Sequence, residues 1–146
     1  MRRRFLAWVL ALVAGLAQAG AYDDILGAAN RGDSTAVIDL LKRGMDVNTA
    51  DQSGSTLLMI AARNGSQALL EALLINRANV NRRNQVGDTA LMLAVKLGNF
   101  ELVQMLVEAD ADMDMADYDG VTALRLGVKL GHKEIVEYLR KTGAFE

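Results

Sequence analysis

The chain has 146 residues, of which 51% are hydrophobic and 23% are charged, and its formal net charge is −2. This length suits one domain, and this balance of apolar and charged residues is not that of a disordered chain. Cysteine and proline are both absent, which excludes a disulfide framework, a cysteine-ligated zinc site and a thiol nucleophile.

The first 21 residues have the layout of a secretory signal peptide. Three arginines at positions 2–4 precede an uncharged apolar run over residues 5–17, and Ala17-Gln18-Ala19 fits the small-residue cleavage pattern. The run has 13 residues, whereas a membrane span needs about 20. A cleaved signal peptide over residues 1–19 is therefore preferred to an uncleaved anchor or a buried helix. Cleavage after Ala21 is the near alternative.

The arginines also resemble the twin-arginine export pattern R-R-x-F-L, but nothing here needs a cofactor, so the general secretory route is favoured. Removal of residues 1–19 takes three arginines and no acids, leaving 13 basic and 18 acidic residues and a net charge of −5. Such a chain lacks the basic footprint that nucleic-acid binding requires. The signal suggests a bacterium, so we expect a periplasmic protein that meets a membrane only during export.

A unit of 33 residues recurs along the rest of the chain. Its clearest copy, residues 54–81, predicts a short helix over Leu57–Arg63, a break at Gly65, a second helix over Gln67–Ile75 and then a loop. Three series of residues keep the same step, namely Gly32, Gly65, Gly98 and Gly131; Gly54, Gly87 and Gly120; and Leu40, Leu73, Leu106 and Leu139. A period of this length indicates a stacked repeat array.

The unit G-x-T-x-L-x-x-A-A-x-x-G, followed by an aliphatic helix and G-A-x-V-N, resembles the ankyrin repeat. The resemblance covers about residues 22–146 and implies an all-α solenoid of four stacked helix-turn-helix repeats with hairpin-like loops. The expected repeats are residues 22–50, 51–83, 84–116 and 117–146. The first and last are expected to be caps with polar outer faces, with Asp23 capping the first helix and Arg140 replacing a leucine near the end of the array.

The chain departs from the ankyrin pattern T-P-L-H at the start of each first helix. Thr56-Leu57-Leu58-Met59 lacks the proline, which is pre-organised for a first helical turn, and the histidine, which in the family hydrogen-bonds within and between repeats. The third and fourth repeats lack both as well. Arg77 and Asp110 stand where glycine usually ends the second helix, and a left-handed residue other than glycine costs about 1 kcal/mol. We therefore expect a modestly stable array.

No residue pattern indicates catalysis, a metal site or a cofactor. His132, the only histidine, is interpreted as a turn residue. The acidic run from Asp110 to Asp119 has Met115 where a calcium loop requires glycine, and the repeat register accounts for its acids. Most methionines fall on core positions rather than in a copper(I) site. Met115 is the exception, because we expect it on a hairpin tip.

In such an array the hairpin tips and first helices line one face, called here the concave face, and the second helices form the back. Ankyrin-like proteins bind partners through side chains on this face that the repeat itself does not need, so the resemblance places the protein-binding residues by register. They are Arg63, Arg82, Arg83, Gln85, Val86, Lys96, Met115, Tyr118, Asp119, Val121, Lys129 and Leu130. Ser55, Asp88 and Leu97 are expected on the same face.

Two groups stand out on the concave face. The basic cluster consists of Arg63, Arg82 and Arg83, and the apolar patch of Met115, Tyr118, Val121 and Leu130. Arginine and tyrosine are enriched at binding hot spots, because both combine a large contact area with hydrogen-bonding ends. An alternative interpretation pairs Arg82 and Arg83 with Asp117 and Asp119 of the next hairpin, where exposed ion pairs contribute only about 0–1 kcal/mol.

The sequence thus predicts a non-catalytic, monomeric module that binds a folded protein of unknown identity and acts as an adaptor that stabilises or localises it. An immunity-type inhibitor of a toxin or enzyme is the alternative. A periplasmic metal or oxidant buffer that uses Met115 and the acidic hairpins is a further alternative.

Overall fold

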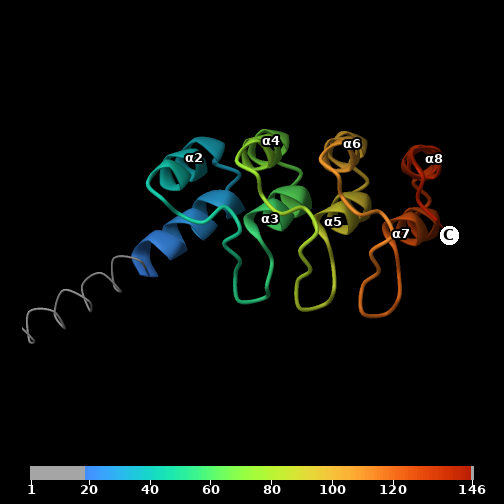
Figure 1. Ribbon diagram of the computed structural model, residues 1–146, viewed down its shortest axis with the longest axis horizontal. Helices are drawn as coiled ribbons and strands as arrows, with labels where there is room; N and C mark the ends of the chain where they lie inside the picture. The colour runs from blue at the N-terminus through green and yellow to red at the C-terminus, as the bar shows by residue number, and fades with distance from the viewer. Residues whose placement is uncertain (1–18, 146) are drawn as a thin grey trace, which may run out of the picture.

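The predicted repeats form a row of stacked helix pairs in the computed structural model, which describes residues 19–145 (Figure 1). The first pair consists of helical residues 19–30 and α2 (Ser34–Lys42). The pairs that follow are α3 (Leu57–Asn64) with α4 (Gln67–Ile75), α5 (Ala90–Leu97) with α6 (Phe100–Glu108), and α7 (Ala123–Leu130) with α8 (Lys133–Thr142). The second helices form one row and the first helices another, and the hairpin loops extend away from both (Figure 1).

The helix of the first repeat begins earlier than expected. Asp23 lies inside the helical stretch 19–30, so the prediction that Asp23 caps this helix is wrong. Alanine at positions 19 and 21 favours helix, and no proline interrupts the stretch. The predicted signal peptide, residues 1–19, lies outside the described residues except for Ala19, which is already helical.

A capping threonine begins each first helix from the second repeat onward. Its hydroxyl oxygen accepts the amide hydrogen three residues further on, at 3.3 Å in each of the pairs Thr56–Met59, Thr89–Met92 and Thr122–Arg125. This bond satisfies one of the backbone donors left open at a helix start, and it confirms the cap predicted at Thr56. The same helices end at Gly65, Gly98 and Gly131, all in the left-handed conformation.

The hydrophobic core runs along the array between the two rows of helices. The middle is the most enclosed part, since residues 57–62 are all buried. The small side chains of Ala61 and Ala62 let the neighbouring first helices lie close, as the sequence indicated. Met59 and Met92 stand where the ankyrin pattern has histidine, and both are buried. Apolar contacts therefore replace the polar bond that the histidine makes in the family.

Side-chain oxygens that accept backbone amide hydrogens hold the loops in register. Within each hairpin, one oxygen accepts from the residues two and four positions further on, at 2.8–3.1 Å, and these acceptors are Asp51, Asn84 and Asp117. Between repeats, an oxygen accepts from an amide 31 residues further on, at 2.8–3.0 Å, in the pairs Asn48–Asn79, Asn81–Asp112 and Asp114–Phe145. The acidic residues after Asp110 thus belong to the repeat, as its register predicted.

Two departures from the ankyrin pattern keep the backbone that glycine would adopt. Arg77 and Asp110 both have a φ of 62°, in the left-handed region where a side chain costs about 1 kcal/mol. The repeat therefore imposes this conformation through its neighbouring hydrogen bonds. The amide of Ala78 donates to the carbonyl of Leu73 at 3.0 Å, and the amide of Ala111 donates to that of Leu106 at the same distance.

Neighbouring hairpins lie in close contact at Gly87. A Cβ atom on this residue would lie 2.6 Å from the amide nitrogen of Tyr118 and 3.0 Å from the Cα of Asp117, so only glycine fits between the two hairpins. Gly120 has the same place in the last hairpin and a similar φ, 78° against 88°. A Cβ there would have no atom within 4 Å, because the described array ends at that hairpin.

We expect Gly87→Ala to destabilise the array more than Gly120→Ala. Both changes place a Cβ in a left-handed conformation, at about 1 kcal/mol. Only Gly87→Ala also forces two backbones apart, and overpacking of this kind costs about 1–3 kcal/mol more. The measurement is urea unfolding, followed by circular dichroism, of the chain from Gly20, which keeps every residue of the core. Equal losses of unfolding free energy would contradict the close hairpin contact.

Candidate protein-binding surface

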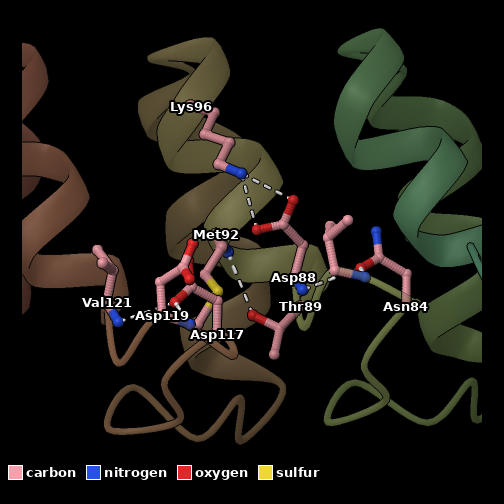
Figure 2. Close-up of polar contacts among 9 residues, drawn as sticks. Asn84, Asp88, Thr89, Met92, Lys96, Asp117, Asp119 and Val121 are labelled. Atoms are coloured by element: carbon pink, nitrogen blue, oxygen red, sulfur yellow. Dashed lines mark hydrogen bonds and ion pairs between the residues drawn. The ribbon is translucent and has the colours of Figure 1, made fainter.

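The guanidinium groups of Arg82 and Arg83 are exposed and make no ion pair within residues 19–145. The alternative pairing with the next hairpin is therefore absent. Asp117 instead accepts amide hydrogens of its own hairpin at 2.9 Å, one of them from Asp119 (Figure 2). Arg63, at the end of α3, reaches the first repeat, where its Nη2 donates to Oδ1 of Asn30 at 3.3 Å. Two arginines of the basic cluster are thus available to a partner.

Large apolar side chains are exposed along the concave face. Tyr118 and Val86, on adjacent hairpins, are 66% and 63% exposed. Leu97 and Leu130, at the ends of α5 and α7, are about half exposed. These four side chains leave much of their apolar surface in water, whereas the side chains of the core leave almost none. This surface is the part of the array that a protein partner would cover.

Two members of the predicted apolar patch are less available than expected. Val121 is half-buried and packs against the core. Met115 is also half-buried, and it precedes Ala116, which pairs with Thr122 at the base of the hairpin. The expectation that Met115 lies on the hairpin tip is therefore wrong, because the pairing places the tip at residues further along the chain.

Lys96 is engaged within the chain by an ion pair with Asp88. The ammonium nitrogen lies 2.7 Å from both carboxylate oxygens (Figure 2). Asp88 is only 5% exposed, so its carboxylate needs this partner. Ser55, also expected on the concave face, is buried too, with its hydroxyl 2.9 Å from that of Ser53. Asp88 and Ser55 support the hairpins rather than contact solvent, which corrects their placement.

The remaining predicted side chains differ in how freely they can move. Gln85 bridges two hairpins, because its Nε2 donates to the carbonyl of Gln52 at 2.7 Å and its amide donates to that of Ser53 at 3.0 Å. Asp119 and Lys129 are exposed, and neither side chain makes a hydrogen bond or ion pair within the described residues. Gln85 therefore presents a fixed edge, while Asp119 and Lys129 can adapt to a partner.

The carboxylate of Asp51 shows how the hairpins are stabilised electrostatically. Burial by itself would raise its pKa, but this effect is outweighed. The carboxylate accepts hydrogen bonds from the Ser53 hydroxyl at 2.6 Å and from the amides of Ser55 and Ser53. Together with the positive charge of Arg63, these bonds hold the pKa of Asp51 below its ordinary value of 3.8. Folding therefore favours the ionised carboxylate.

Metal and membrane sites find no support among residues 19–145. No three His, Asp or Glu side chains gather there as a metal site requires. In the same residues, every helix is too short or too polar to cross a membrane. His132 lies against the preceding repeat, with its Cε1 2.7 Å from where a Cβ of Gly98 would stand. This close contact fits its interpretation as a turn residue.

Comparison with known families agrees with the geometry. The model for ankyrin repeats, built of three copies, matches twice, over residues 25–117 and over residues 59–145. The chain belongs to the ankyrin repeat family. No curated protein matched the chain. Ankyrin repeats are protein–protein interaction modules and are generally non-catalytic, so the described array is a helical interaction module.

Two exposed side chains of this ankyrin array escaped the sequence analysis. Val128 is 55% exposed, although Val95 and Ala62, at the same place in earlier repeats, are fully buried. Phe145 is 75% exposed beyond α8. The missed signal was the register itself, because a side chain that packs against the following repeat loses its cover in the last repeat.

We expect acid to weaken this ankyrin array partly through Asp51. Its folded pKa lies below 3.8, so its contribution to stability is complete above that value and is lost as the pH falls through the folded pKa. Asp51→Asn keeps an acceptor oxygen but cannot titrate. Between about pH 5 and pH 3, the variant should therefore lose less unfolding free energy than the unmodified chain.

The matched control is Asp119→Asn, because the Asp119 side chain is exposed and accepts no hydrogen bond within the described residues. Urea unfolding at each pH gives the comparison. Parallel pH profiles for Asp51→Asn and the unmodified chain would rule out the role assigned to the Asp51 carboxylate.

Proposed function

We propose that this ankyrin array is exported to the periplasm and binds one folded protein through its concave face, as an adaptor that stabilises or localises that protein. The observation that carries the proposal is the set of exposed side chains with no role in the fold. Tyr118 and Val86 leave about two thirds of their surface in water, and Arg82 and Arg83 have no internal ion pair among the described residues.

A folded partner suits this surface better than a small molecule. The hairpins are rigid, since each has an oxygen that accepts two backbone amides, and they form a continuous edge across three repeats (Figure 1). Rigid, large side chains with polar ends bind proteins with little loss of conformational entropy. An inhibitor of a toxin or enzyme would use the same surface and is distinguished by the activity of the captured protein.

The sequence of the first 21 residues supports the proposed export. Arginines precede a short apolar run and a small-residue cleavage pattern, which is the arrangement of a secretory signal. A cysteine-free chain is also suited to an oxidising compartment, because it has no thiol to oxidise.

Expression of the full chain in a bacterium should yield a periplasmic protein that begins at Gly20. The expected result is a single N-terminal sequence and a mass lower by residues 1–19. The control replaces Ala17 and Ala19 with large charged residues, which should block cleavage. An intact N-terminus on the unmodified chain in the periplasm would contradict cleavage, and a cytoplasmic location would contradict export.

The Arg83→Ala, Tyr118→Ala double variant should lose the partner in a pull-down from periplasmic extract. Loss of two central contact side chains costs about 2 kcal/mol or more, which is more than a tenfold loss of affinity. The control is Ile75→Ala, Lys141→Ala, because Ile75 is similarly exposed, at 73%, and both residues lie on second helices. Retention by both variants would place the site away from the concave face, and capture of nothing by the unmodified chain would count against the adaptor function.

A further inference from the structure

The C-terminal end face of the array has the shape of an unfilled junction between repeats. Val128 is 55% exposed there. A hollow of about 390 Å³ opens beside it, and a second of about 260 Å³ adjoins the first. The hollows are lined by Leu124, Arg125, Gly127, Val128, Lys129, Gly131, Lys133, Val136 and Arg140. No carboxylate is among these residues.

The charges on this face replace apolar residues of the interior repeats. Arg125 has the place of the buried Met92, and Lys133 has that of Phe100. Solubility alone would be served by charges of either sign, and a mature chain with a net charge of −5 has ample acids. Four cations around an apolar floor therefore indicate that the surface opposite this face carries negative charge.

The N-terminal end face offers such a surface. A hollow between helix 19–30 and α2 is lined by Asp24, Ala28, Arg31, Ala36, Asp39, Leu40 and Arg43. Asp24 has the place of Leu57, Ala90 and Ala123, which are all buried where one repeat meets the repeat before it. Leu40 has the place of Leu73, which is also buried in the array but is half-buried here. This face therefore combines apolar side chains with two carboxylates.

We propose that a second copy of this chain stacks head to tail, with its N-terminal end face on the C-terminal end face of the first. The junction between the third and fourth repeats supplies the template. There, the rings of Phe100 and Tyr138 meet edge to face at 5.4 Å. One period later, the same two places are held by Lys133 of one copy and Asp39 of the next, which are oppositely charged.

A second register pair gives the same result for apolar contact. At the template junction, a Cβ on Gly127 would lie 3.7 Å from Cγ1 of Val95, an ordinary van der Waals distance. One period later, these places are held by Ala28 of the next copy and by the exposed Val128. The methyl group of Ala28 would therefore rest on the side chain that the last repeat leaves uncovered.

The contact is heterologous, so it leaves a free end on each copy and builds open chains or rings rather than a closed dimer. Arg31 and Arg43 also line the N-terminal end face and offset part of the attraction. Association is thus expected to be weak and to depend on salt, because the charges are close to solvent. This proposal replaces the expectation of a monomer and is independent of the concave face.

The test is sedimentation of the chain from Gly20 at increasing concentration and low salt. The unmodified chain should form species larger than dimers. Lys133→Asp alone and Asp39→Lys alone should each raise the concentration needed for association by about tenfold or more, because each places like charges in contact. Both side chains are exposed, so the variants should fold, and their circular dichroism is compared with that of the unmodified chain.

An equal mixture of the two variants decides the geometry. The carboxylate introduced at position 133 of one variant would face the ammonium group introduced at position 39 of the other, so the mixture should form discrete one-to-one dimers that cannot extend. The control charge reversals, Lys141→Asp and Asp46→Lys, lie off the two end faces and should leave association unchanged. A monomer at every concentration, single variants that associate normally, or a mixture that does not dimerise would each overturn the proposal.

Discussion

The structure depends on the close approach of consecutive repeats. Gly87 leaves its hairpin in contact with the backbone of the next hairpin, where a Cβ would lie 2.6 Å from the Tyr118 amide. In the helical layer, Ala61 and Ala62 let the first helices pack without intervening bulk. Because every repeat must meet the same spacing, the small residues recur at 33-residue intervals, and the larger aliphatic residues fill the space that remains in the core.

This constraint divides the residues of each hairpin between structure and surface. The side chains that accept backbone amides, such as Asp51 and Asn84, are held by the turn itself. The side chains between them point outward and are not needed for the fold, which is why Val86 and Tyr118 are exposed. A rigid edge of interchangeable side chains suits recognition of another protein, since the fold tolerates almost any residue there.

The same constraint has a different consequence at the two ends. An interior repeat buries both of its faces, whereas a terminal repeat buries only one. Exposure of Val128 beside Lys133, and of Leu40 beside Asp39, follows from this asymmetry. Polar substitution at the ends is expected of any array, but the opposite signs at register-matched places distinguish these two faces and suggest that each is complementary to the other.

The sequence by itself determined the ankyrin family, the number and order of the repeats, the capping threonines and most of the core, because each depends on residue types recurring at a fixed step. Tertiary structure alone decided how individual side chains are used. It showed that Asp88 is buried against Lys96, that Val121 packs on the core, and that Arg82 and Arg83 lack, among the described residues, the carboxylate partners the register had offered. A period gives each residue its place in the repeat, but burial and pairing depend on which neighbours the adjacent repeat presents, and that is a property of the packed array.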